Sequence, residues 1–262
     1  MKYHLEQLVI ELTRRCNLSC AHCLRGTSQN CNIDTKYIDS LFEKVNSIGS
    51  LTLTGGEPSL VPELIEYVTN KAKENSITIG SFYIATNCVN VLDAFIIAVM
   101  NLYLYCEEKD SCSLSISNDG YHIDENINTE NYEKLEVFKF TNKRESKDGE
   151  YYNNRVINQG NGINFNSKEL TIDVFELDNN DYIYGMVYLN CKGNILCGCD
   201  FSYETQDHEI MIVSSVDKFS FNKCKLYNKR IEKIAKESRS REVNYMIEYY
   251  DNYINVIEPE AA

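Results

Sequence analysis

Short apolar segments alternate with longer amphipathic ones along the first 165 residues of this chain. The apolar segments are Leu8–Thr13, Ser50–Thr54, Phe82–Thr86, Leu114–Ser117 and Arg155–Asn158. The segments between them with helical periodicity are Thr35–Ile48, Pro62–Glu74, Asn90–Tyr105 and Thr129–Phe138. Strands that alternate with helices of this length predict βαβ units, and therefore an α/β fold whose parallel sheet is covered by helices.

Two of the expected helices carry end signals. Asp34 is a good N-cap for the helix Thr35–Ile48, and Gly49 directly after it is typical of a helix C-terminus. Pro62 opens the next helix, where the first turn tolerates proline.

A polar, glycine-rich or cysteine-rich motif follows each predicted strand. In chain order these motifs are Cys16–Cys23, Thr54–Pro58, Thr86–Asn87, Ser117–Gly120 and Gln159–Gly162. Ligands of parallel α/β folds bind at the C-terminal ends of the strands. The sequence therefore predicts that the five motifs meet at one edge of the sheet and form a site there.

The pattern changes after about residue 165. Leu170–Leu177 and Tyr182–Leu189 are typical of longer strands, and a hairpin is expected around Lys192-Gly193-Asn194. A charged helix is expected from Lys223 to Tyr250. We expect residues 1–165 to form a core, and residues 166–262 to supply the last barrel strand or strands, a hairpin containing cysteines and a C-terminal helix.

The composition indicates where the protein is located and which partners it can bind. The chain has 262 residues, a formal charge of −13 and eleven cysteines. It lacks an N-terminal signal pattern and an apolar run long enough to span a bilayer, so a cytoplasmic location is expected. Cytosolic thiols stay reduced, which favours metal binding or catalysis over disulfides. Strong acidity disfavours nucleic-acid and membrane partners. Cys88, Cys106 and Cys112 stand apart and are expected to be core residues.

The segment Cys16-Asn17-Leu18-Ser19-Cys20-Ala21-His22-Cys23 has the spacing C-x3-C-x2-C. Three thiolates this close can bind a cubane iron–sulfur cluster and leave its fourth iron without a protein ligand, unlike four-cysteine ferredoxin sites. An open iron can bind a substrate or cofactor, which favours catalysis over electron transfer alone. The alternatives are a zinc site completed by His22 or Cys31, and three buried thiols.

This cysteine motif after a first strand, with Gly55-Gly56-Glu57-Pro58 after the second, resembles the radical S-adenosylmethionine (SAM) superfamily over roughly residues 7–165. The resemblance implies a partial (β/α)6 barrel and a [4Fe–4S] cluster on Cys16, Cys20 and Cys23. It also implies that SAM chelates the fourth iron and is cleaved reductively to a 5′-deoxyadenosyl radical. An electron-donor protein such as flavodoxin or ferredoxin would be a partner of such an oxidoreductase.

The same resemblance implies further SAM contacts. Gly55 and Gly56 would let the backbone approach the ligand, Glu57 or a nearby carbonyl would accept from the SAM ammonium group, and Pro58 would fix the turn. The remaining expected cofactor-binding residues are Asn87, Ser115, Ser117 and His22. The family pattern is not matched throughout, because Cys88 replaces a usual glycine and Asn161 a usual arginine.

A second cysteine group consists of Cys191, Cys197, Cys199 and Cys224. The hairpin around Gly193 resembles the start of the SPASM or twitch extensions that hold auxiliary clusters in peptide-modifying members of the superfamily. Cys191 lies only two residues before that glycine, which departs from the usual spacing. A second cluster and four metal-free thiols both remain open.

Three functions follow from these features. The first is a radical SAM enzyme that abstracts hydrogen from a peptide or protein side chain. The second is a radical SAM enzyme that acts on a nucleotide or small metabolite, or that activates a glycyl-radical enzyme. The third is a non-catalytic iron–sulfur or zinc protein, which gives no account of the Gly-Gly-Glu-Pro segment.

Overall fold

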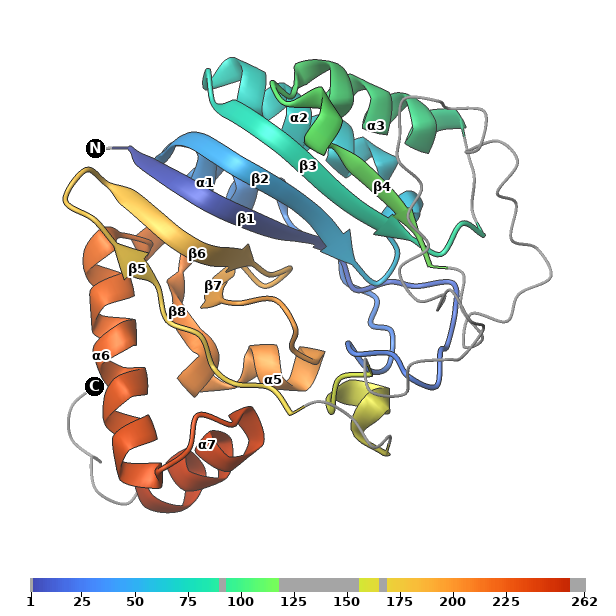
Figure 1. Ribbon diagram of the computed structural model, residues 1–262. Helices are drawn as coiled ribbons and strands as arrows, with labels where there is room; N and C mark the ends of the chain where they lie inside the picture. The colour runs from blue at the N-terminus through green and yellow to red at the C-terminus, as the bar shows by residue number, and fades with distance from the viewer. Residues whose placement is uncertain (1, 90–92, 118–155, 165–168, 255–262) are drawn as a thin grey trace.

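The computed structural model describes residues 2–89, 93–117, 156–164 and 169–254, and its strands form one open sheet (Figure 1). The strands are β1 (Tyr3–Thr13), β2 (Val45–Gly55), β3 (Thr78–Thr86), β4 (Ser113–Ile116), β5 (Glu176–Leu177), β6 (Tyr182–Leu189), β7 (Asn194–Cys197) and β8 (Ile212–Ser215). Their order is β4-β3-β2-β1-β6-β7-β8, and β5 pairs with β6.

The strands from β4 to β6 run parallel, whereas β5, β7 and β8 add antiparallel pairs at the other end of the sheet. The expected α/β class, with an open and largely parallel sheet, is therefore confirmed. β6 lies beside β1 with Leu8 opposite Val187, so the segment after residue 165 extends the same sheet. A strand was expected at Arg155–Asn158; Arg155 lies outside the described residues, and among residues 156–158 Ile157 occupies a β-bridge position.

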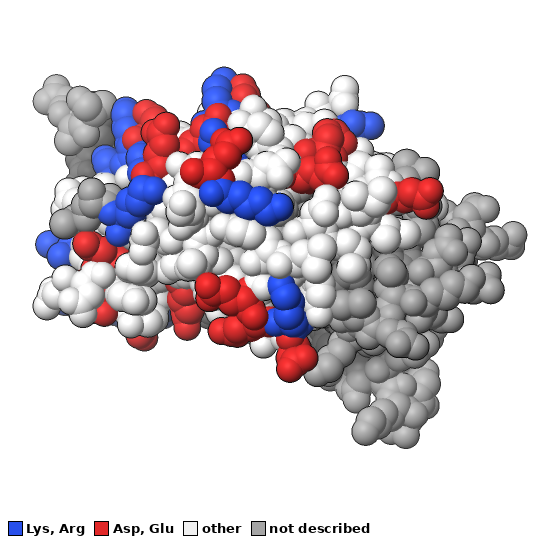
Figure 2. All heavy atoms as spheres, turned by 90° about the horizontal axis from the view of Figure 1, so that it is seen from above, with Lys and Arg blue, Asp and Glu red and all other residues white. Residues whose placement is uncertain are grey.

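The described helices are α1 (Thr35–Phe42), α2 (Pro62–Glu74), α3 (Asp93–Tyr105), α5 (Tyr203–Asp207), α6 (Phe221–Ser238) and α7 (Val243–Tyr249). In Figure 1, α1, α2 and α3 lie on one side of β1–β4, while α6 lies beside β8 and α7 packs at the end of α6. None of the helices in the described ranges is both long and apolar enough to cross a membrane. Acidic and basic side chains are intermingled on the face viewed from above (Figure 2).

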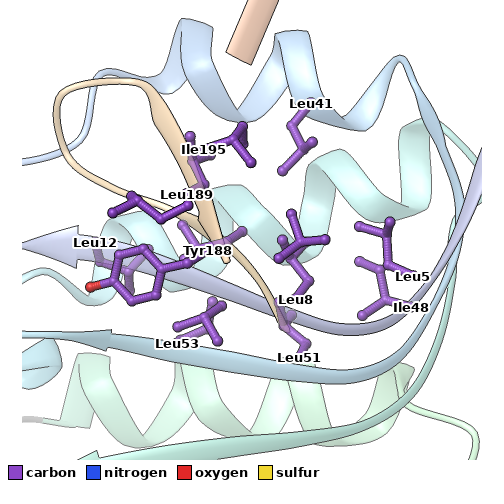
Figure 3. Packing of buried hydrophobic residues seen from close by; sticks show 14 of the residues in the cluster. Leu5, Leu8, Leu12, Leu41, Ile48, Leu51, Leu53, Tyr188, Leu189 and Ile195 are labelled. Carbon is purple, nitrogen blue, oxygen red and sulfur yellow. The ribbon is translucent and has the colours of Figure 1, made fainter. Parts of the chain in front are cut away.

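One hydrophobic cluster joins the two halves of the chain (Figure 3). Leu8 of β1 and Leu51 of β2 pack in the same cluster as Leu189 of β6 and Ile195 of β7, and all four are fully buried. Cys88, Cys106 and Cys112 are buried in this cluster as expected. Because the burial is continuous, the hairpin is part of the structure that supports the core strands.

The helix expected at Thr35–Ile48 is shorter than predicted. Asp34 does cap α1, since its side chain accepts a hydrogen bond from the Lys36 amide, but the helix ends at Phe42. The next residues begin β2, where Val45 pairs with Tyr3 of β1. Gly49 lies within this strand and is not a helix cap. A Cβ there would lie 2.7 Å from the Glu6 carbonyl oxygen, so close strand packing explains the glycine.

The C-terminal predictions are met in part. Tyr182–Leu189 is β6 with the predicted bounds, and the hairpin turns at Gly193, which has φ +78°. The strand expected at Leu170–Leu177 is reduced to its last two residues. The long helix is broken between α6 and α7 by Arg239, which adopts the left-handed conformation with φ +60°. The helix expected at Thr129–Phe138 lies outside the described residues.

Candidate functional site

Four of the five predicted motifs meet in a cavity of about 170 Å³ at the C-terminal ends of the parallel strands, called here the motif cavity, whereas Asn161 of the fifth lines a neighbouring cavity. Its walls include the predicted residues Cys16, Cys20, His22, Cys23, Gly55, Gly56, Glu57, Pro58, Asn87 and Ser117. Ser115 of β4 is buried but does not line this cavity. The same three cysteines also line a neighbouring cavity of about 130 Å³.

The loop after β1 carries the three cysteines, which are all partly exposed. The Leu18 amide donates to Cys16 Sγ at 3.4 Å, and Ser28 Oγ accepts from the Cys16 amide at 3.0 Å. Burial raises the pKa of the Cys16 thiol, and the negative charges of Glu57 and Cys23 add to the rise. A cation bound here would favour the thiolate, which is the form that ligates metals.

Asn161 stabilises the cysteine loop, although it lies 141 residues after Cys20 in the sequence. Its Nδ2 donates to the Cys20 carbonyl at 3.0 Å, and its amide donates to the Cys23 carbonyl at 2.9 Å. Gly160, with φ +58°, lets the two segments approach, because a Cβ there would lie 2.4 Å from the Leu24 carbonyl oxygen. This contact explains why the expected fifth motif contains glycine and asparagine.

Gly55 and Gly56 bring the end of β2 against the residues that lead into the cysteine motif. A Cβ on Gly55 would lie 2.1 Å from the Thr13 carbonyl oxygen, and one on Gly56 would lie 2.2 Å from that of Arg15. The Gly56 amide donates to Thr13 and the Glu57 amide to Arg15. These glycines are therefore required by contact between two backbone segments, a role that the sequence analysis did not foresee.

Glu57 joins the ends of β2 and β3. Its carboxylate is buried and accepts from Thr86 Oγ1 at 2.7 Å, from the Asn87 amide at 2.8 Å and from the Ser59 amide at 3.0 Å. Burial raises the pKa of this carboxyl group, and the three donors oppose the rise. Both oxygens thus bind protein donors, which makes Glu57 a brace within the wall of the motif cavity.

Asn87 connects this brace to the cysteine loop. Its Nδ2 donates to Asn17 Oδ1 at 2.8 Å and lies 3.9 Å from Cys16 Sγ. Asn87 is therefore positioned to orient the Cys16 thiol, a contact that sequence spacing could not reveal. His22 is buried, with 5% of its surface exposed, and also lines the motif cavity.

A buried charged network holds the start of the cysteine loop. Arg14 is fully buried, and its Nε donates to Glu11 Oε1 at 2.7 Å. Its two terminal nitrogens donate to Asp207, and also to Gln29 and Gln206. Burial acts to lower the pKa of Arg14, but the charges of Glu11 and Asp207 raise it above its usual value. The C-terminal half thereby fixes the residue two positions before Cys16.

Arg25 is the second cationic residue that the sequence analysis missed. It lines the motif cavity and both of the cavities that adjoin it. Its Nη1 donates to the carbonyls of Cys199 and Phe201, each at 2.6 Å, and its guanidinium lies over the Tyr188 ring. An arginine two residues after Cys23 was the only available sequence signal.

The four late cysteines occupy different surroundings. Cys191 Sγ donates to the Glu11 carbonyl at 3.2 Å, whereas Cys197 lies near Cys224 in the core. Burial raises the pKa of Cys191 and Cys197 and raises that of Cys224 to about 12. Cys199 is partly exposed beside Asp200. Within the described ranges, no three His, Cys, Asp or Glu side chains are grouped as ligands for one metal ion.

The contact of Gly56 with Arg15 gives a direct test of the loop. Gly56→Ala places a Cβ against a backbone carbonyl, so we expect a clear loss of stability, on the order of 1–3 kcal/mol, and weaker retention of reconstituted iron. Thermal unfolding and iron content measure both effects. Gly185→Ala is the matched control, because its Cβ would meet no atom nearer than 3.8 Å and only its positive φ adds strain. Equal behaviour of the two variants would contradict the assigned contact.

Comparisons with known proteins show the fold. No protein-family model matches the chain. The uncharacterized protein MJ0907 of Methanocaldococcus jannaschii is 35% identical over 75 residues, which span 27% of this chain and 26% of that protein. BtrN, solved in an open conformation, is 12% identical with a TM-score of 0.45 and covers 87% of this chain and 86% of its own. The structure of anSMEcpe with bound AdoMet and the Cp18Cys peptide is 12% identical with a TM-score of 0.53, over 93% of this chain and 88% of that one. At this identity, the similarity to anSMEcpe shows that the two chains share a fold.

Proposed function

We propose that this chain is a radical SAM enzyme that holds a [4Fe–4S] cluster on Cys16, Cys20 and Cys23. The observation that carries the proposal is the motif cavity, where three thiols of a C-x3-C-x2-C loop face a Gly-Gly-Glu-Pro segment. The cavity lies at the C-terminal edge of parallel strands, where this kind of fold binds ligands. The fold shared with anSMEcpe, solved with bound AdoMet, supports the same conclusion.

The donor set fits a cubane cluster better than a single ion. A mononuclear zinc site needs sulfurs close together, because Zn–S bonds are only about 2.3 Å long. A cubane spreads its thiolates farther apart. In the described part of the chain no such close group occurs. Of the two candidate fourth zinc ligands, His22 lines the motif cavity and Cys31 does not. Three thiols without a fourth would leave one iron open.

When bound, the cluster and SAM would supply reductive cleavage and a radical that removes hydrogen from a substrate. The residues of this chain would position these groups. Glu57 and Asn87 hold the wall beside Cys16, and Asn161 holds the backbone of Cys20 and Cys23. Ser117 lines the motif cavity and can contact SAM. An electron-donor protein is part of this proposal.

The substrate belongs to the same proposal. A peptide or protein side chain is favoured, because anSMEcpe, which shares the fold, was solved with a peptide. We further propose that residues 1–165 form the radical SAM core and that residues 166–262 complete and brace it. The hydrogen bonds that link Arg14 to Gln206 and Asp207 support this division of roles.

The proposal is tested by assaying SAM cleavage. Anaerobically reconstituted protein is expected to bind SAM and, on reduction, to release methionine and 5′-deoxyadenosine. Chromatography of the products measures the reaction, and protein without iron is the control. Reconstituted protein that binds no SAM would refute the proposed function.

A single cluster is expected. The late cysteines are dispersed, because Cys191 contacts the Glu11 carbonyl, Cys199 lies beside Asp200, and Cys197 lies near Cys224 in the core. Reconstituted protein should therefore contain about four iron atoms per chain. The double change Cys197→Ser and Cys199→Ser should leave this number unchanged. About eight iron atoms, falling to about four in the double variant, would instead establish an auxiliary cluster.

A further inference from the structure

A second cavity extends along the sheet from the motif cavity. This sheet cavity has a volume of about 450 Å³ and shares Leu24, Arg25, Thr54, Ala85 and Ser117 with the motif cavity. It also reaches Thr52 of β2 and Tyr83 of β3, each two residues before a shared one. Two residues along a strand advance about 7 Å, with side chains on the same face. The sheet cavity therefore continues directly from the candidate cofactor site.

The walls of the sheet cavity are neutral except at its rim. The sheet contributes apolar and hydroxyl side chains, namely Val9, Thr52, Thr54, Tyr83, Ala85 and Met186. The charged residues among its lining are Arg25 and Asp200, which belong to the two loops over the sheet. The hydrogen bonds from Arg25 to the Cys199 and Phe201 carbonyls join these loops. A ligand in the cavity would thus meet one fixed positive charge and one negative charge at the rim.

The two arginines of the site differ in a way that points to a ligand. Arg14 forms ion pairs with Glu11 and Asp207. Arg25 forms no ion pair with any residue in the described ranges, and both of its hydrogen bonds there leave from Nη1. A half-buried guanidinium usually pairs with a carboxylate or phosphate, because its desolvation is otherwise costly. Nε and Nη2 of Arg25 have no hydrogen-bond partner among the described residues, so a planar anion in the sheet cavity would find two donors there.

We propose that the sheet cavity binds the substrate as an amino-acid unit with a free α-carboxylate, which pairs with Arg25, while its side chain enters the cavity toward Thr52 and Tyr83. The inference rests on the proposed function, since a group that loses hydrogen must lie next to the cofactor cavity. A cavity of this size accommodates one small ligand or one residue. The unit is a free amino acid or the C-terminal residue of a peptide, and Asp200 distinguishes these sources because it would pair with a free ammonium group.

The test is isothermal titration of reconstituted, SAM-bound protein with proteinogenic L-amino acids, their N-acetyl derivatives and their α-carboxamides. At least one acid is expected to bind, and its amide should bind about ten- to a hundredfold more weakly. Arg25→Gln should abolish the difference between acid and amide, and Arg25→Lys should keep part of it. Arg241→Gln, an exposed arginine between α6 and α7, is the matched control and should keep all of it.

The Asp200→Asn variant distinguishes a free amino acid from the C-terminal residue of a peptide as the bound unit. A free amino acid should bind more weakly to Asp200→Asn than to the wild type. The N-acetyl derivative, which mimics a C-terminal residue, should bind to both proteins with the same affinity. The proposal is overturned if no acid binds at millimolar concentration, if acid and amide bind equally to the wild type, or if the acids compete with SAM. SAM cleavage by Arg25→Gln is measured in parallel, so that a failure here is distinguished from a failure of the radical SAM assignment.

Discussion

Replacing Cys16, Cys20 and Cys23 together by alanine is expected to reduce reconstituted iron from about four atoms per chain to background, and to abolish SAM cleavage. The three thiols line one cavity, and no other cysteine lines it. Without them the cluster has no ligands in this part of the protein, so the effect should be complete. Iron analysis, the visible absorption of the cluster and product chromatography measure it.

Cys31→Ala is the matched control for this experiment. Cys31 is also partly exposed and belongs to the same loop, but it does not line the motif cavity. Its replacement should leave iron content and SAM cleavage near wild-type values. Product formation by the triple variant, or an equal loss in the control, would show that the cluster is held elsewhere.

Replacing Arg14 by methionine is expected to give the second large effect, a destabilisation of about 3–5 kcal/mol, because it leaves the fully buried Glu11 carboxylate without its cation. The Glu11 carboxylate would retain donors from Tyr188 OH and the Cys191 amide, which do not neutralise its charge. The free energy of unfolding, obtained by urea titration of wild type and variant, measures the loss.

Two further variants separate charge from packing. In Glu11→Leu/Arg14→Met both charges are gone, and the double variant should be more stable than Arg14→Met alone. Lys71→Met removes a surface cation that bridges Asp39 and Glu74, and it should change stability much less. A double variant less stable than Arg14→Met would indicate that the network contributes mainly through packing.

Segments with strong local signals could be predicted from sequence. The helix Pro62–Glu74 and the strand Tyr182–Leu189 have the predicted bounds, because apolar periodicity and the proline agree with the final packing. Val45 and Ile48 also fit a helix, but pairing of β2 with β1 determines their conformation. Local periodicity cannot reveal such a partner, so the helix was extended too far.

The residues of the candidate site also divide into those that could be predicted from the sequence and those that could not. The motif rule placed Cys16, Glu57 and Ser117 around one cavity, because parallel strands bring their C-terminal ends together. It could not show that Gly56 is required by contact with the backbone of Arg15. It also could not single out Arg25, whose side-chain hydrogen bonds go to residues more than 170 positions away in sequence.

The pairing of β6 with β1 has a consequence for biosynthesis. β1 is made before the other described strands, yet one of its two neighbours is β6, and the Glu11 carboxylate accepts a hydrogen bond from Tyr188, 177 residues later. Contacts of such long sequence separation form late, because a long loop must close before they add stability. On the ribosome, β1 remains a sheet edge until the hairpin emerges, and the segment around Cys16 lacks its anchor at Asp207 until then. Under the proposed function, metal loading of the cysteine loop is therefore expected to follow the docking of β6 and the contact with Asp207.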